Sequence, residues 1–227
     1  MNIEIKKHYL SSHSLSSNLT NDQMNDLCSL ASFRVADKNA NIYFENDSDS
    51  RIYLVLKGVI KISEMGDQGH EMIKEIIREG DFFGDFSFNS FGNQMEFATS
   101  LMDDTVICSF NRAEFEAVLN RNAILALNFA KKVGSKFRRL ELRHSNLVFN
   151  DVKTRLINFF RDWASTEGKR FGNKIVLQNY LTHNDIAGLI STSRQSVTIL
   201  LNELKESGMF NYNRKEIEIN TGAFSIN

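Results

Sequence analysis

The sequence contains no proline and only two cysteines among its 227 residues. Without proline, turns must be made by glycine, asparagine, aspartate and serine, and proline cannot mark element boundaries. Cys28 and Cys108 lie far apart, and neither has a partner at the spacing of a metal site. The pattern excludes a disulfide scaffold and a structural zinc site. We expect two reduced thiols in the core of a cytoplasmic protein.

Other absences narrow the function. No run of about 18 apolar residues is long enough to span a membrane. The first residues, MNIEIKKHYL, lack the apolar core of a signal peptide. The five histidines follow no metal-ligand pattern. No Ser-His-Asp order, phosphate-binding loop or pair of catalytic carboxylates can be assembled, so we expect that the protein is not an enzyme.

The net charge of −1 does not by itself indicate a nucleic-acid partner, but the charge is unevenly distributed. Residues 149–227 contain 10 Lys and Arg against 8 Asp and Glu, a balance of +2. The remaining residues contain 17 against 20, a balance of −3. This weak asymmetry agrees with a C-terminal part that binds DNA.

Two short helices are predicted within residues 181–210, LTHNDIAGLISTSRQSVTILLNELKESGMF. Thr182 can cap the first helix, and small hydroxyl residues at 191–193 form a turn before the second. Gly208 follows the second helix where a left-handed residue is favoured. One face of the second helix is apolar, at Val197, Leu200, Leu201 and Leu204. This pattern predicts a helix-turn-helix, whose second helix can enter the DNA major groove.

The outward face of the second helix carries the residues that could read bases. Arg194 can pair with guanine, Gln195 with adenine, and Thr198 can contact a thymine methyl, with Asn202 on the same face. Hydroxyl residues at the two helix starts can cap the helices or contact phosphate, at Thr182, Ser193 and Ser196. An ordinary helical hairpin with a solvated polar face would show the same pattern.

Strands on both sides of this hairpin favour DNA binding. Residues 173–179 and 216–219 read as strands, and a polar turn precedes the second one. Together they predict a winged helix-turn-helix, in which Arg214 and Lys215 are placed to meet phosphate.

The N-terminal half predicts a different architecture. Residues 1–22 are polar and rich in serine and asparagine, which predicts a loose lead-in, and a short helix follows at 21–32. From Phe33 to Phe110 the pattern has a period of two with frequent turn residues, which is typical of an all-β unit. We expect these strands to close into a small β-barrel or β-roll.

A long helix is predicted over residues 122–150. Its narrow apolar stripe has heptad spacing, at Ala126, Ala130, Val133, Phe137, Leu140, His144 and Leu147. The stripe could join a second copy of the chain or could pack against the chain's own roll. Asp151 then caps another helix, so the domain boundary is expected near 148–151.

The order of these motifs resembles a known family. A β-roll with LKGVIKI and EGDFFGD, a long heptad helix, DVKTRL and a winged helix-turn-helix resemble the bacterial transcription factors of the CRP/FNR family (cyclic-AMP receptor protein and fumarate–nitrate reductase regulator). The resemblance covers residues 20–220. It implies a homodimer that binds double-stranded DNA at a palindromic operator and contacts or excludes RNA polymerase, with the roll sensing a small effector.

The fold implied by this resemblance is α+β. Residues 1–121 would form the N-terminal helix and the β-roll, which is cyclic-nucleotide-binding-like and of the double-stranded jelly-roll type. Residues 122–150 would form the dimerisation helix, and residues 151–227 the winged helix-turn-helix.

The family's effector site is matched only in part. Its turn glycines correspond to Gly58, Gly80 and Gly84. Asp85 replaces a glutamate that binds ribose, and residues 93–99 (NQMEFAT) contain no cation to hold a cyclic phosphate. An adenine-contacting Thr-Ser pair is replaced by Leu140 and Glu141. The corresponding pocket would be lined by Phe83, Gly84, Asp85, Phe86, Glu96, Phe97, Phe137, Leu140 and Glu141.

These departures argue against the family's known cofactors. We expect no cyclic AMP, no haem and no iron–sulfur cluster, since the family's N-terminal cysteine cluster is absent. Phenylalanines are enriched at 82, 83, 86, 88 and 91. They could fill the roll in place of a ligand, or they could line a pocket for an unknown apolar effector.

The recognition helix also departs from the family pattern. Gln195 replaces a frequent glutamate, and Ile199 replaces an arginine that many members use on guanine. We therefore expect an operator unlike the best-known ones, with adenine favoured opposite Gln195. The leading interpretation is a sequence-specific transcription regulator. The alternative is a ligand-sensing module that acts through a protein partner, with weak or vestigial DNA binding.

Overall fold

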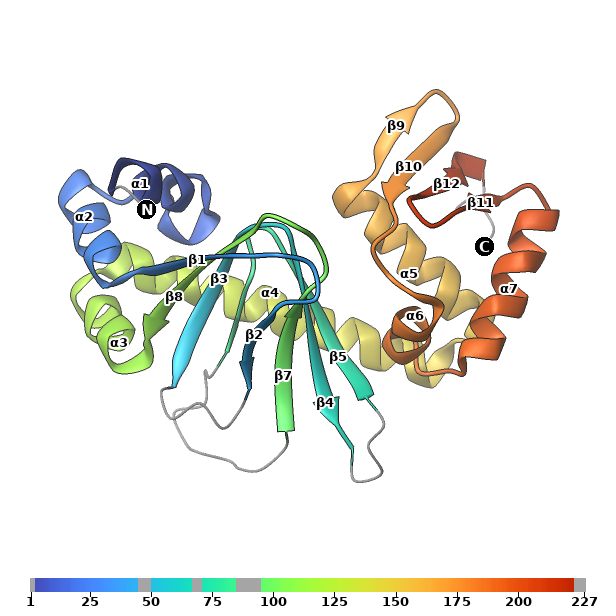
Figure 1. Cartoon of the computed structure of the whole chain (residues 1–227), viewed down its shortest axis with the longest axis horizontal. Coiled ribbons are helices and arrows are strands. Elements are labelled where there is room, and N and C mark those ends of the chain that lie inside the picture. The colour runs from blue at the N-terminus through green and yellow to red at the C-terminus, as the bar shows by residue number, and fades with distance from the viewer. Residues whose placement is uncertain (1–2, 45–49, 67–70, 85–94, 223–227) are drawn as a thin grey trace. The chain divides into compact units, whose positions relative to one another are not determined.

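The computed structural model describes residues 3–44, 50–66, 71–84 and 95–222. The chain forms two compact units, residues 1–139 and 140–227. The division falls inside the long helix α4 (Ala123–Phe149), so the last part of this helix groups with the C-terminal unit. Figure 1 shows the elements of both units.

Two four-stranded antiparallel sheets form the β-roll of the N-terminal unit. In spatial order, the first contains β1 (Ser32–Ala36), β8 (Thr105–Asn111), β3 (Arg51–Lys57) and β6 (Phe82–Gly84). The second contains β2 (Asn41–Phe44), β7 (Met95–Ser100), β4 (Val59–Met65) and β5 (Glu71–Arg78). The expected roll of jelly-roll type is confirmed.

The middle of strand β3, residues 52–56, is apolar at every position because both faces of the strand are covered. Val55 belongs to a cluster of buried residues from both sheets, and Tyr53 packs against this cluster. On the other face, Leu54 and Leu56 join a cluster formed with helices. Successive side chains of a strand point to opposite faces, so a strand buried on both sides needs apolar residues at nearly every position.

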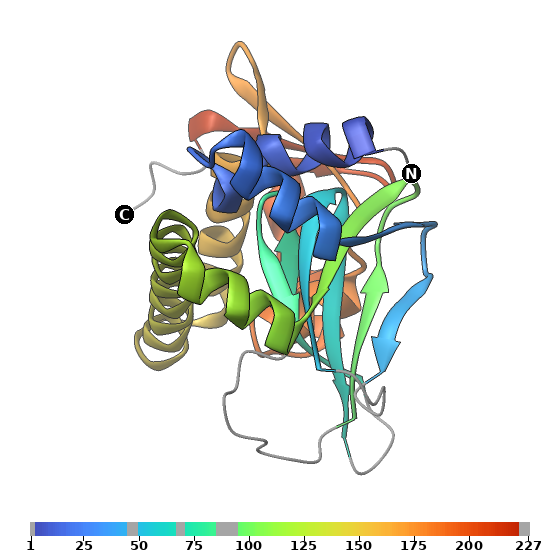
Figure 2. The same ribbon diagram turned by 90° about the vertical axis from the view of Figure 1, so that its left-hand side faces the viewer.

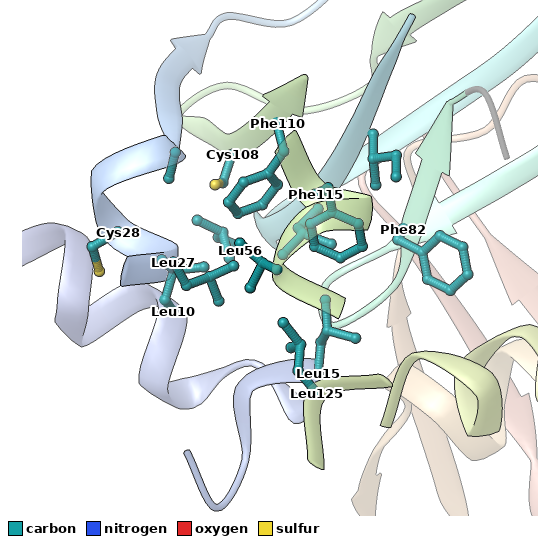
Figure 3. Packing of buried hydrophobic residues seen from close by; sticks show 14 of the residues in the cluster. Leu10, Leu15, Leu27, Cys28, Leu56, Phe82, Cys108, Phe110, Phe115 and Leu125 are labelled. Carbon is teal, nitrogen blue, oxygen red and sulfur yellow. The ribbon is translucent and has the colours of Figure 1, made fainter. Parts of the chain in front are cut away.

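Helices cover the outer face of the first sheet. They are α1 (Ile3–Ser12), α2 (Asn21–Leu30), α3 (Arg112–Arg121) and the start of α4. Figure 2 shows the two N-terminal helices, in blue, against the roll. Figure 3 shows their leucines meeting Phe110 and Phe115, with Cys28 and Cys108 in the same cluster. Both cysteines are free and buried, as expected, and burial raises the pKa of each thiol.

The prediction of a loose lead-in at residues 1–22 is wrong. This segment forms α1 and the short 3-10 helix η1 (Ser14–Ser16), and Leu10 and Leu15 are fully buried. The Asn128 amide of α4 donates to the backbone carbonyls of Leu15 and Ser17, both at 3.0 Å. Tertiary contacts therefore order a segment whose own sequence has little helical periodicity.

The C-terminal unit is a winged helix-turn-helix, as predicted. It contains α5 (Val152–Glu167), α6 (His183–Leu189) and α7 (Arg194–Glu206). Its sheet has the order β11 (Phe210–Tyr212), β12 (Glu216–Asn220), β10 (Lys174–Gln178) and β9 (Lys169–Phe171). Phe160 lies between Trp163 and Phe210, with ring centroids at 6.0 and 5.1 Å. This aromatic core fixes α5 beneath the helix-turn-helix.

We predict that His13 makes the N-terminal unit acid-sensitive. Its Nδ1 accepts the Leu15 N–H at 3.1 Å, and burial, followed by the charge of Lys132, lowers the pKa of His13 to about 4. Between that value and the unfolded pKa of about 6.5, the unfolded state binds more protons. The free energy of unfolding should therefore fall by up to about 3 kcal/mol as pH decreases through this window.

Urea unfolding at a series of pH values checks this prediction. His13→Asn keeps an acceptor for the Leu15 N–H but cannot titrate, so its stability should depend less on pH within the window. Parallel curves for the two proteins between pH 4 and 6.5 would contradict the assignment to His13.

Candidate nucleic-acid interface

The first helix of the helix-turn-helix begins with a reciprocal capping box. The Thr182 hydroxyl accepts the Asp185 N–H at 3.1 Å, and the Asp185 carboxylate accepts the Thr182 N–H at 2.7 Å. Backbone N–H groups that have no partner within the helix are satisfied in this way. The predicted N-cap at Thr182 is confirmed.

Arg155 of α5 holds the turn between α6 and α7. Its guanidinium donates to the carbonyls of Asn150 at 2.8 Å, Ile190 at 2.9 Å and Ser191 at 3.2 Å. Ser191 has a left-handed backbone, with φ of 55°. Arg155 thus satisfies carbonyls at the end of α6 and ties the turn to the residue that follows α4.

The second helix, α7, presents a polar face. Ser193 caps it, and its hydroxyl accepts the Ser196 N–H at 3.1 Å. Gly208 adopts φ of 72° after the helix, as predicted. One face is buried at Val197, Leu201 and Leu204. The opposite face is exposed at Arg194, Gln195, Ile199 and Asn202, with Thr198 half-buried.

His183 at the start of α6 contacts this face. Its Nδ1 lies 2.9 Å from the Thr198 hydroxyl, which in turn donates to the Arg194 carbonyl at 3.0 Å. Thr198 has one hydroxyl proton, so the Nδ1–H of His183 is the donor in the first contact. Burial, followed by the charge of Arg194, lowers the pKa of His183 and so favours the neutral imidazole.

The wing meets the recognition helix through Tyr212. The Tyr212 hydroxyl donates to Asn202 Oδ1 at 2.9 Å. Beyond it, the Asn213 side chain accepts the backbone N–H of Lys215 at 2.7 Å and shapes the wing's tip. Arg214 and Lys215 are exposed at this tip. Exposed cations on a wing can contact phosphate, whereas the polar face of α7 can meet base edges.

The candidate effector residues are brought together only in part. Phe83 is buried and stacked on Tyr53, with centroids 4.9 Å apart, so it fills space between the sheets. Gly84 has φ of 112°, and a side chain there would clash with the Arg51 carbonyl. Phe97 is half-buried in β7, and Phe137 is exposed on α4. Leu140 and Glu141 belong to the other unit, and Asp85 and Phe86 lie outside the described residues.

Glu96, also expected in the effector site, is already paired. Its carboxylate lies 2.8 Å from Lys74, which also lies 3.4 Å from Glu64. Two carboxylates therefore share one ammonium group, and together these three groups carry a net negative charge. Lys74 comes from β5, so the segment 93–99 could not by itself reveal this cation.

The first half of α4 is attached to the turn between β5 and β6. Lys136 donates to the Phe82 carbonyl at 3.1 Å and pairs with Glu75 at 2.8 Å. Lys132 donates to the Gly80 carbonyl, and Arg139 pairs with Asp81. Part of α4 therefore packs against the chain's own roll.

The predicted heptad stripe faces away from these contacts along most of its length. Phe137 is 61% exposed, Leu140 62% and Val133 42%. Ala130, His144 and Leu147 are also exposed, and Ala126 is half-buried. A row of large apolar side chains exposed on a surface helix is typical of an interaction face.

Two family models match this chain. Residues 33–122 match the cyclic nucleotide-binding domain, and residues 154–221 match the Crp-like helix-turn-helix domain. The same two modules, in the same order, are the roll and the winged helix-turn-helix of the structure. The chain belongs to the CRP/FNR family of transcription regulators.

Known members of the CRP/FNR family align over most of the chain. The global nitrogen regulator of Nostoc sp. is 27% identical over 81% of this chain and 82% of its own length. The cyclic AMP receptor protein of Thermus thermophilus is 24% identical over 80% of this chain and 81% of its own length. A solved CooA mutant from Carboxydothermus hydrogenoformans shares the fold, with a TM-score of 0.73, 22% identity and coverage of 94% of each chain.

For this CRP/FNR regulator, the structure places most of the residues expected to face DNA on α7, at its N-cap and on the wing, and it places Thr182 at the start of α6. It adds Arg155, His183 and Tyr212, whose roles the sequence patterns do not assign and whose contributions come through contacts between elements. Within the described residues, no group of three or more His, Cys, Asp or Glu could hold a metal ion, and no helix is long and apolar enough to cross a membrane.

Proposed function

We propose that this CRP/FNR regulator is a homodimer that recognises a two-fold-symmetric operator without cyclic AMP. The observation that carries the proposal is the exposed face of α7, where Arg194 and Gln195 stand in the first turn of a capped helix. In a helix-turn-helix, the first residues of the second helix contact base edges. Arg194 would pair with guanine and Gln195 with adenine, while Arg214 and Lys215 would meet phosphate.

The exposed stripe of α4 supports the dimer. The heptad spacing of Val133, Phe137 and Leu140 suits two helices that pack along a shared seam. Two copies joined in this way would present two recognition helices, and an operator palindrome would mirror their symmetry. Residues 122–150 would then serve as the dimerisation helix, as the sequence suggests, with RNA polymerase as a further partner at the promoter.

Independence from cyclic AMP is supported by charge and by packing. Glu96 has the sign that disfavours a bound cyclic phosphate, and the Lys74 ammonium beside it is already shared between Glu96 and Glu64. Phe83 and Tyr53 occupy the space between the sheets. An apolar effector remains the second possibility for the roll.

Selection of bound duplexes from a random DNA pool, without added ligand, tests the readout. We expect a palindrome with half-site centres about one helical turn apart. Arg194→Ala should weaken specific binding by roughly ten- to hundred-fold, because one bidentate base contact is lost. Arg161→Ala on α5 is the matched control and should bind as the wild type does. Unchanged operator affinity of Arg194→Ala would favour the protein-partner alternative.

Phe137→Glu tests the dimer. A charge at the centre of the stripe should convert the dimer to a monomer in sedimentation experiments, because two buried carboxylates would face each other. Leu142→Glu changes a similarly exposed leucine, 55% exposed, that lies off the stripe, and it should remain dimeric. Dissociation by both variants, or by neither, would contradict a seam along this stripe.

Cyclic AMP should change neither the melting temperature nor the operator affinity. A ligand present at 100 times its dissociation constant would stabilise the fold by about 2.7 kcal/mol, which is readily seen in a melting curve. A thermal shift at millimolar cyclic AMP, or tighter operator binding in its presence, would contradict this prediction.

A further inference from the structure

Ile199 is an exposed apolar residue on the otherwise polar face of the recognition helix. Every residue of α7 is described, and among them Ile199 is the one large apolar side chain that is exposed, at 59%. Val197, Leu201 and Leu204 of the same helix are buried, and Leu200 is half-buried. Ile199 therefore lies outside the apolar stripe that packs α7 onto its own unit.

The position of Ile199 is central on the surface expected to meet DNA. Gln195 lies four residues before it and Asn202 three residues after it, so both are its neighbours on successive turns of the helix. Both neighbours are exposed, as Ile199 is. A single exposed apolar residue is common on protein surfaces. Here the position matters, because a DNA groove that covers Gln195 and Asn202 also covers the residue between them.

The chemistry of the major groove offers one match for an apolar side chain. Base edges there present hydrogen-bond donors and acceptors, and thymine alone adds an apolar group, its C5 methyl. An isoleucine placed against a donor or an acceptor would displace water from that polar group and return no hydrogen bond. Contact between apolar groups also needs no particular direction, unlike a hydrogen bond. Ile199 can therefore select thymine without the fixed orientation that an amide or a guanidinium requires.

We propose that Ile199 is a specificity-determining residue, which contacts the C5 methyl of one thymine in each half-site and disfavours the other three bases there. This inference rests on the proposed DNA-binding function, and it goes beyond the hydrogen bonds assigned to Arg194 and Gln195. It predicts that part of the operator's sequence specificity comes from the burial of apolar surface.

Uracil in place of thymine tests the inference, because the two bases differ only in the C5 methyl group. The operator would first be selected from a random pool with the wild type. Each thymine would then be replaced in turn by uracil, and the affinities of the wild type, Ile199→Val and Ile199→Ala would be measured by fluorescence anisotropy. Phe171→Ala is the matched control, since Phe171 is an apolar side chain of the same unit, 63% exposed, that lies in β9.

We expect uracil at one position to weaken binding of the wild type by roughly four-fold for each half-site, the effect of one buried methyl group. Ile199→Ala should not distinguish thymine from uracil at that position, as a double-mutant cycle requires for two groups in contact. Ile199→Val should retain part of the difference, and Phe171→Ala all of it. Melting temperatures should stay close to that of the wild type, because Ile199 is exposed and alanine is a better helix former.

Two results would overturn the inference and leave the proposed function intact, because an operator is still recovered. The first is an operator that contains no thymine, or in which uracil replaces every thymine without loss of wild-type affinity. The second is a uracil effect of the same size in the wild type and in Ile199→Ala, which would assign the methyl contact to another residue. A wild type that enriches no sequence would instead overturn the proposed function together with the inference.

Discussion

The geometry of the recognition module depends on one guanidinium group. Arg155 donates to carbonyls of the residue after α4, the end of α6 and the turn into α7. These carbonyls lie just beyond helix ends, where carbonyl groups lack a partner within a helix. A planar guanidinium with five donors can satisfy three of them at once, which an ammonium group cannot do with the same fixed geometry. The orientation of α7 follows from this contact and from the aromatic core around Phe160.

Several of the residues that we expect to face DNA are held in place by other side chains. Thr198 is held by His183, Asn202 by Tyr212, and the wing tip by Asn213. For Thr198 and Asn202 the support comes from a different element than the residue it holds. Such contacts fix side chains before DNA binds, which reduces the ordering that binding must bring about.

In the N-terminal unit the roll keeps the family's architecture while its interior is filled by aromatic and aliphatic side chains. Phe83 and Tyr53 stack between the sheets, and Glu96 shares Lys74 with Glu64. Lys136 pairs with Glu75 of β5, and Arg139 pairs with Asp81 in the turn between β5 and β6, so both residues join α4 to the roll. The stripe on another face of α4 stays exposed. One helix thus has two uses, with its basic side against the roll and its apolar side free for a partner.

The sequence by itself determined the winged helix-turn-helix, the β-roll and the long helix, because each has a strong local pattern: a helix cap at Thr182, a period of two from Phe33, and heptad spacing from Ala126. Only the tertiary structure decided the rest. It ordered residues 3–16 as helices through Leu10, Leu15 and Asn128, and it paired Glu96 with a lysine on another strand. It also recruited Arg155, His183 and Tyr212 to the interface. These residues act across elements that are distant in sequence, and a local pattern carries no record of which distant side chain will satisfy a given carbonyl, hydroxyl or amide.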